Sequence, residues 1–332
     1  MDPFMQRALK LAEKGYTSPN PMVGAVLVRD GEIIGEGYHR KAGMPHAEVE
    51  AIEDAKRRGN EIEGSTLYVT LEPCCHYGRT PPCTDAIIRE GIGKVIAGMR
   101  DPNPKVNGKG MEKLREAGIE VIEKNYKECR RINEVYFKYT KEKMPFILLK
   151  IAITLNGCYK TLDRYISSQE ALRYAHELRK RYDAVAIGAN TLRDDDPQLN
   201  VRLVDAEGRD PYKIVFVRDT STLPREFKLL HDEKFVAVCQ KNPRGINAIE
   251  AEDLREGMKK LADMGITSVL LEGGPTIAQS ALNSDLVDKC LFIVAPGFAD
   301  GEQLRLNLSI RMHSVFKLGS DIAVEAYVHG HN

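Results

Sequence analysis

The sequence predicts a two-domain α/β protein. Its 332 residues exceed the length of one typical domain and suit two. In both halves, short apolar segments typical of strands alternate with segments of helical period. Met144 and Pro145 mark the predicted boundary, because proline does not continue a helix. We therefore expect a first domain over residues 1–143, connecting helix included, and a second over residues 144–332.

The first domain is predicted to be a three-layer α/β/α sandwich. Residues 4–14 have the pattern of an amphipathic helix, and residues 23–37 form a hairpin that turns at Asp30 and Gly31. The other expected elements are helices at 47–58, 84–90 and 110–117, strands at 67–71, 94–98 and 119–122, and a polar, basic helical connector at 127–143. Helices alternating with strands cover both faces of a sheet.

The second domain is predicted to begin with a buried strand that runs into a glycine turn, over residues 146–157. A helix over 168–182 is expected to have Ser167 or Ser168 as its N-cap. Further strands are predicted at 184–188, 214–217, 234–239 and 268–272, with a helix at 253–264. The last strand leads into residues 273–276, Gly-Gly-Pro-Thr, before a helix. This arrangement suits an anionic ligand, although a tight turn explains the same residues.

Two motifs in the first domain indicate a hydrolytic zinc site. His46 and Glu48 lie at the start of a predicted helix, and Cys74 and Cys83 follow downstream. One imidazole and two thiolates make three zinc ligands, which leave the fourth tetrahedral position open to water. A glutamate that does not bind the metal can then carry protons, as in the nucleobase deaminases. The pattern therefore predicts zinc-dependent deamination.

A closed structural zinc site is the main alternative. Cys75 or His76 would then supply a fourth ligand. Such a site leaves Glu48 without a role, and the chain lacks the C-x-x-C pairs that structural sites commonly use. A non-catalytic binding module stapled by zinc is a second alternative, and metal removal would unfold it.

Composition restricts the class of partner. The chain has 48 basic and 48 acidic residues, so its zero net charge gives no electrostatic reason to bind nucleic acid or an anionic membrane. It has no long apolar run, and its first residues lack the pattern of a signal peptide. Seven scattered cysteines are typical of reduced thiols. We expect a cytoplasmic enzyme with a small-molecule substrate.

The first domain resembles the deaminase domain of the bifunctional deaminase/reductase family of riboflavin biosynthesis. The matching segments are residues 19–24, 35–39, 45–48, 70–74, 76–83, 101–104 and 108–110. The long gap from Cys74 to Cys83 has this family's form and differs from that of tRNA adenosine and cytidine deaminases. The resemblance implies a cytidine-deaminase-like fold in which His46, Cys74 and Cys83 bind zinc. It also implies that Glu48 donates and accepts the proton and that Asn20 contacts the substrate.

The second domain resembles the reductase domain of the same family, through residues 195–197, 199–202 and the glycine turn. This implies a dihydrofolate-reductase-like fold that uses NADPH. The implied cofactor contacts are Ala152, Thr191, Asp195 and the loop 274–280, which begins with Gly274, Pro275 and Thr276. The implied substrate contacts are Arg179, Leu199, Arg202 and Glu272. Arginines suit a substrate that carries a ribose phosphate.

The predicted function is therefore a two-step enzyme of riboflavin biosynthesis. It deaminates 2,5-diamino-6-ribosylamino-4(3H)-pyrimidinone 5′-phosphate and then reduces the ribosyl chain with NADPH, giving 5-amino-6-ribitylamino-uracil 5′-phosphate. The resemblance alone implies a homodimer.

The second domain departs from the family pattern in a shortened segment, residues 159–165, where Asp163 replaces a substrate-binding serine and Tyr165 replaces a tryptophan. An active deaminase with an impaired or redirected reductase is thus an alternative. A further hypothesis pairs Arg218 with the 2′-phosphate of NADPH.

Overall fold

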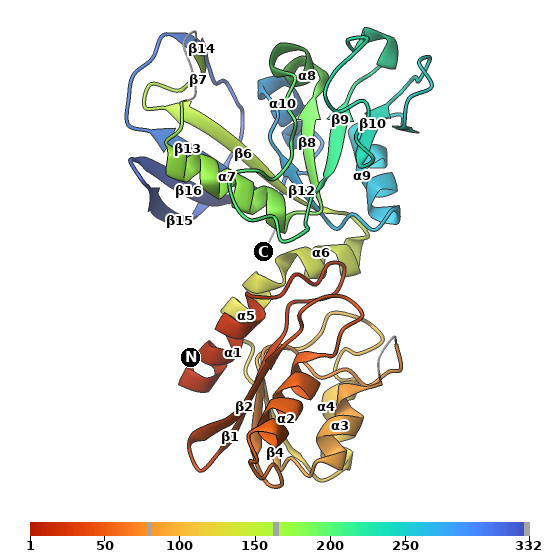
Figure 1. Ribbon diagram of the computed structural model, residues 1–332, viewed down its shortest axis with the longest axis vertical. Helices are drawn as coiled ribbons and strands as arrows, with labels where there is room; N and C mark the ends of the chain where they lie inside the picture. The colour runs from red at the N-terminus through yellow and green to blue at the C-terminus, as the bar shows by residue number, and fades with distance from the viewer. Residues whose placement is uncertain (79–80, 162–165, 329–332) are drawn as a thin grey trace. The chain divides into compact units, whose positions relative to one another are not determined.

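The computed structural model describes residues 1–78, 81–161 and 166–328 (Figure 1). The chain divides between Lys143 and Met144 into two compact units. Within the described ranges, none of the helices has the length and apolar character needed to cross a membrane.

The first unit is built on a five-stranded sheet in the order β2-β1-β3-β4-β5. Its strands are β1 (Gly24–Arg29), β2 (Glu32–Tyr38), β3 (Thr66–Val69), β4 (Lys94–Ala97) and β5 (Glu120–Glu123). β1 pairs antiparallel with β2 and β3, whereas β3, β4 and β5 are parallel. The parallel strands end at the same edge of the sheet, and the loops that follow them meet there.

Helices cover both faces of this sheet, as the sequence predicts. They are α1 (Pro3–Ala12), α2 (Ala47–Arg57), α3 (Cys83–Arg89) and α4 (Lys109–Glu116). A side chain at Gly24 would overlap the backbone of α1, and one at Gly37 would overlap α2. Gly37 is the register partner of Ala25, the residue after Gly24, and successive strand residues face opposite sides. The two helices therefore lie on opposite faces, which confirms the three-layer fold.

The connector is two helices rather than one. α5 (Lys127–Ile132) ends at Asn133, and α6 (Glu134–Glu142) begins after it. Asn133 leaves the helical conformation with φ −113° and ψ 17°, and its amide group bonds to the backbone of Met22. The helical connector predicted over 127–143 is therefore interrupted at Asn133, whose side chain bonds to a backbone segment distant in the sequence.

The second unit contains a nine-stranded sheet in the order β11-β10-β9-β8-β12-β6-β13-β16-β15. β16 pairs antiparallel with β13 and β15, and the other neighbours are parallel. The strands are β6 (Phe146–Thr154), β8 (Ala184–Gly188), β9 (Tyr212–Phe216), β10 (Phe235–Cys239), β11 (Ala248–Glu250), β12 (Ser268–Leu271), β13 (Lys289–Ala295), β15 (Ile310–Leu318) and β16 (Asp321–Val328). The mostly parallel sheet, with the connecting helices given next, confirms the α/β prediction.

The helices of this unit connect the strands, and the glycine turn directly precedes one of them, α10. They are α7 (Gln169–Arg181), α8 (Ala189–Asp195), α9 (Leu254–Asp263), α10 (Pro275–Asn283) and a short 3₁₀ helix, η1 (Thr220–Thr222). Ser168 caps α7, because its hydroxyl accepts a hydrogen bond from the N–H of Ala171. A separate two-stranded sheet pairs β7 (Cys158–Thr161) with β14 (Gly301–Gln303).

Candidate metal centre and reductase cleft

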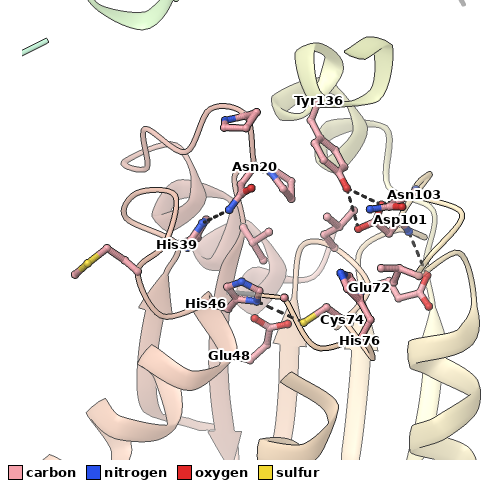
Figure 2. A pocket seen from close by; sticks show the side chains of 18 residues that line it. Asn20, His39, His46, Glu48, Glu72, Cys74, His76, Asp101, Asn103 and Tyr136 are labelled. Atoms are coloured by element: carbon pink, nitrogen blue, oxygen red, sulfur yellow. Dashed lines mark hydrogen bonds between the residues drawn. The ribbon is translucent and has the colours of Figure 1, made fainter. Parts of the chain in front are cut away.

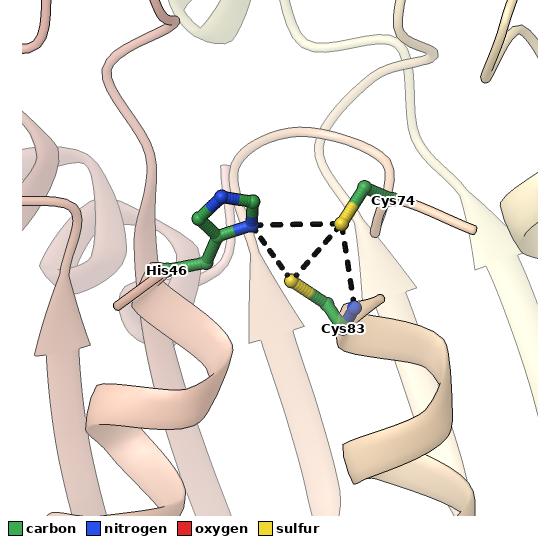
Figure 3. Close-up of side chains that lie close together, drawn as sticks. All are labelled: His46, Cys74 and Cys83. Atoms are coloured by element: carbon green, nitrogen blue, oxygen red, sulfur yellow. Dashed lines mark hydrogen bonds between the residues drawn. The ribbon is translucent and has the colours of Figure 1, made fainter. Parts of the chain in front are cut away.

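Three side chains from three different segments converge in the first unit (Figure 3). His46 directly precedes α2, Cys74 lies in the loop after β3, and Cys83 is the first residue of α3. Nδ1 of His46 lies 3.0 Å from Sγ of Cys83 and 3.5 Å from Sγ of Cys74, and the two sulfurs are 3.3 Å apart. Imidazole and paired thiols at this spacing form a candidate zinc site.

The donor set fits zinc. Tetrahedral zinc with ordinary bond lengths holds nitrogen and sulfur ligands about 3.5–3.8 Å apart, so a small outward movement of these atoms would admit the ion. Among the described residues, only these three form such a group of candidate ligands. Sγ of Cys75 instead contacts the carbonyl oxygen of Lys105 at 3.8 Å. The geometry therefore favours three protein ligands over a closed four-ligand site.

The charges at the centre suit a cation. The hydrogen bond with Cys83 lowers the pKa of Cys74 to about 4, with a further contribution from His46. The hydrogen bond with Cys74 and burial raise the pKa of Cys83. The hydrogen bond with Cys74 also raises the pKa of His46.

Glu48 lies in the first turn of α2, buried, two residues beyond His46. It lines the same pocket as His46 and Cys74. Burial raises the pKa of Glu48 to about 7, against the opposing effect of His46. A carboxyl group with a pKa near 7 can both accept and donate a proton at neutral pH.

The centre opens into a pocket of about 350 Å³ (Figure 2). Asn20 lines one wall, and its Nδ2 lies 3.2 Å from Nε2 of His39. Nδ1 of His39 lies 3.0 Å from the carbonyl oxygen of Pro45, which can only accept. His39 Nδ1 therefore carries the proton, and Nε2 accepts from Asn20. This leaves Oδ1 of Asn20 available as an acceptor in the pocket.

The opposite wall contains two residues, Asp101 and Tyr136, to which the sequence patterns had given no role. Asp101 is buried there, and Tyr136 of α6 donates its hydroxyl to Oδ1 of Asp101 at 3.0 Å (Figure 2). Burial raises the pKa of Asp101 to about 6. Nδ1 of His76, also in the pocket, is buried without a protein partner among the described residues. Asp101 falls in segment 101–104, which matches the family, whereas Tyr136 lies in the predicted connector, to which no site residue had been assigned.

Glu72 fixes this wall to the metal loop. Its carboxylate is 3% exposed and accepts four backbone hydrogen bonds. The donors are the N–H groups of Asp101, Gly108, Gly110 and Met111, at 3.2, 2.8, 3.0 and 3.3 Å. Gly108 is the N-cap of α4 and has no side chain to offer, so Glu72 satisfies N–H groups that the helix start leaves free.

The second unit contains a larger cleft of about 1090 Å³. All the predicted cofactor residues line it: Ala152, Thr191, Asp195, Arg218, Gly274, Pro275, Thr276 and Ser280. The N–H of Gly274 donates to Oγ1 of Thr191 at 3.2 Å, which joins the glycine turn to α8. Lys150, on β6, also lines the cleft, and sequence reasoning missed it because it lies within an otherwise apolar strand.

The predicted substrate residues form a second group. Glu272 lines the cleft, and Oε2 accepts from Nε and Nη2 of Arg179 at 3.1 and 2.6 Å. Burial raises the pKa of Glu272, but the charges of Arg179 and Lys150 outweigh it, so the pKa is lowered. Oε1 of Glu272 is buried without a protein partner in the described part of the chain.

Leu199 and Arg202 lie beside Arg179 rather than in the cleft lining. Nη1 of Arg179 donates to the carbonyl oxygen of Asn200 at 3.1 Å, and Leu199 is buried with φ 52°. The N–H of Arg202 donates to Nδ1 of His176 at 3.1 Å. The predictions for Asp163 and Tyr165 concern residues outside the described ranges.

The fold and the two sites define a class of protein: a nucleobase-type zinc deaminase joined to an α/β reductase. The model of the cytidine and deoxycytidylate deaminase zinc-binding region matches residues 1–99, and that of the RibD C-terminal domain matches residues 145–324. The chain belongs to the RibD family, the bifunctional deaminase/reductase enzymes of riboflavin biosynthesis.

Similar proteins extend over nearly the whole chain. The riboflavin biosynthesis protein RibD of Aquifex aeolicus is 41% identical over 97% of this chain and 96% of its own length. RibD of Escherichia coli is 37% identical over 88% of this chain and 87% of its own.

Solved structures agree. The diaminohydroxyphosphoribosylaminopyrimidine deaminase/5-amino-6-(5-phosphoribosylamino)uracil reductase of Thermotoga maritima has a TM-score of 0.88 at 35% identity, covering 98% of this chain and 97% of that one. Acinetobacter baumannii RibD has a TM-score of 0.86 at 34% identity, with the same coverages.

Proposed function

We propose that the pocket of the first unit deaminates the diaminopyrimidinone phosphate with His46, Cys74 and Cys83 as zinc ligands. Bound zinc would lower the pKa of water at its open position and so supply hydroxide near neutral pH. Glu48 takes up one water proton and passes it to the ring nitrogen. It then takes the hydroxyl proton of the tetrahedral adduct and passes it to the amino group, which leaves as ammonia; its pKa of about 7 suits both transfers.

The pocket walls orient the pyrimidine. Oδ1 of Asn20 accepts a hydrogen bond from an amino group of the substrate, because its Nδ2 already bonds to His39. Asp101 and His76 face the ring from the other side, where one offers an acceptor and the other an unpartnered nitrogen. These contacts hold the reacting carbon beside Glu48.

The cleft of the second unit holds NADPH and the deaminated product. The loop 274–280 and the N-terminal end of α10 receive cofactor phosphates, and Ala152, Thr191 and Asp195 line the same surface. Arg218 pairs with the 2′-phosphate in this proposal, which is supported by its exposed position in the cleft lining.

Arg179 and Glu272 hold the ribosyl chain for hydride transfer. Glu272 offers Oε1 to a sugar hydroxyl, since both bonds from Arg179 fall on Oε2. Leu199 shapes the adjacent loop, and Arg202 is exposed and available for the substrate phosphate. The enzyme acts on a small phosphorylated molecule, and we infer that it is cytoplasmic. We also infer a homodimer, which the molar mass from light scattering in solution tests.

The convergence of three metal ligands with a buried Glu48 carries this proposal. The test is incubation with the diaminopyrimidinone phosphate, with and without NADPH, while ammonia release and cofactor oxidation are measured separately. The two-step enzyme releases ammonia in both cases and oxidises NADPH only after deamination. Ammonia release without NADPH oxidation would instead identify a deaminase with an impaired or redirected reductase. If neither ammonia release nor NADPH oxidation is observed, the non-catalytic zinc-binding module is the remaining interpretation.

A further inference from the structure

The connector helices contribute directly to the deaminase pocket. Asn133, at the break between α5 and α6, is 2% exposed. Its Oδ1 accepts from the N–H of Met22 at 2.7 Å, and its Nδ2 donates to the carbonyl oxygen of Met22 at 2.9 Å. The amide group thus satisfies both backbone groups of one residue.

Met22 belongs to the segment that forms one pocket wall. Asn20 and Pro21 precede it directly, and both line the pocket. Because Asn133 holds the backbone at Met22, it sets the distance of this wall from the metal centre. Nδ2 of Asn20 is held separately by His39, so this wall is fixed at both its backbone and its side chain.

Tyr136 holds the opposite wall. Its hydroxyl lies 3.0 Å from Oδ1 and 3.3 Å from Oδ2 of Asp101 (Figure 2). The N–H of Asp101 in turn donates to Glu72, two residues before Cys74. Asn133 and Tyr136 are three residues apart, so one side of the connector reaches both walls.

We propose that Asn133 and Tyr136 are positioning residues for deamination, which hold the Asn20 and Asp101 walls at the width that the pyrimidine requires. Both lie outside the deaminase zinc-binding region, whose match ends at residue 99. The inference rests on the proposed deaminase site. It assigns the connector a role in substrate binding, while zinc binding and the reductase remain independent of it.

The test uses full-length, zinc-loaded protein with two minimal substitutions. Tyr136→Phe removes only the hydroxyl, and Asn133→Leu removes both bonds to Met22 at similar volume without burying a charge. Tyr139→Phe, on the same helix but outside the pocket lining, is the matched control. For each variant, the KM and kcat of deamination, zinc content and the rate of NADPH oxidation on the deaminated product are measured.

A lost hydrogen bond that positions substrate predicts a five- to tenfold rise in KM, on the order of a net bond energy. Zinc content, NADPH oxidation and the Tyr139→Phe control stay at wild-type values. Unchanged KM in both variants overturns the proposal. A loss of zinc or of NADPH oxidation that parallels the loss of deamination also overturns it, because it indicates general destabilisation.

A measurement of substrate binding distinguishes failure of this inference from failure of the proposed function. In a Glu48→Gln background, which is expected to bind the diaminopyrimidinone phosphate without turnover, calorimetry measures the dissociation constant before and after Tyr136→Phe. The expected weakening is again five- to tenfold. An unchanged constant overturns the role of Tyr136 alone, whereas no binding to the Glu48→Gln parent overturns the proposed substrate and the inference with it.

Discussion

The N–H of Gly110 donates to Oε1 of Glu72 at 3.0 Å and ties the start of α4 to the loop that carries Cys74. A Cβ atom at position 110 would overlap the carbonyl oxygen of Pro73, the residue between Glu72 and Cys74. Only glycine permits this approach. The metal ligand is therefore positioned by a contact between backbone atoms far apart in the sequence.

Gly110→Ala is expected to displace Pro73 and weaken the metal site. The overlap is with backbone rather than a flexible side chain, so a cost of about 1–3 kcal/mol in unfolding free energy is expected. Competition with a chromophoric chelator measures zinc affinity, and thermal unfolding measures stability. Gly297→Ala is the control, because a Cβ there meets open space. Wild-type zinc affinity in Gly110→Ala would contradict this account.

Glu48→Gln is expected to retain zinc and lose deamination by about 10²–10⁴-fold, because the amide cannot accept and return a proton. Metal analysis and ammonia release measure the two properties. NADPH oxidation on the deaminated product is the internal control and stays unchanged. Full deaminase activity in this variant would reject the proton-carrying role.

Arg218→Ala is expected to reduce the preference for NADPH over NADH by about tenfold or more, since a charged hydrogen bond to the 2′-phosphate contributes about 1.5–3 kcal/mol. The dissociation constants of both cofactors are compared in fluorescence titrations. Arg225→Ala, outside the cleft lining, is the control. An unchanged ratio of the two constants rejects the pairing.

Glu272→Gln is expected to destabilise the second unit by about 3 kcal/mol, because it leaves the largely buried guanidinium of Arg179, whose side chain is 13% exposed, without its counter-charge. Replacing both residues with methionine removes both charges and recovers much of that stability, but not NADPH oxidation. Urea unfolding of the two variants measures the difference. Equal stability of Glu272→Gln and wild type would show that the ion pair is not needed for folding.

The stability of the second unit is expected to fall as the pH falls from about 6.5 towards 4. Burial and the charges of Arg179 and Arg202 lower the pKa of His176 to about 4. The unfolded chain, with an ordinary histidine, therefore binds more protons in this range, which favours unfolding. His176→Asn keeps an acceptor for the N–H of Arg202 but does not titrate.

Thermal unfolding at pH 7 and pH 5 checks this expectation, with the transition of the second unit identified by its upward shift in NADPH. The wild-type transition should fall by more than that of His176→Asn between the two pH values. Equal shifts would mean that other groups dominate the pH dependence.

The metal centre was predictable because each ligand belongs to a short motif beside a recognisable element. His46 precedes a helix, and Cys83 starts one after two prolines. The cofactor residues were carried over by resemblance, and the structure brings them into one cleft. The second unit's parallel order follows from alternating strands and helices.

Other features depend on contacts that no local pattern contains. Asn133, at the break between α5 and α6, bonds to Met22, 111 residues away. Glu72 reaches backbone groups 29 to 39 residues downstream. The sequence patterns gave no assignment to the strands β13, β15 and β16, two of which form the antiparallel margin of the large sheet. Such features depend on tertiary contacts between residues that are distant in the sequence.

Because the connector helices α5 and α6 position the walls of the first pocket, only a very short linker separates the two catalytic units. α6 ends at Glu142 and β6 begins at Phe146, which leaves residues 143–145 as the stretch that belongs to neither. Anyone dividing the gene to express the halves separately should cut there. A cut at residue 99 or 126 would yield a fragment with every zinc ligand but an open, unsupported pocket.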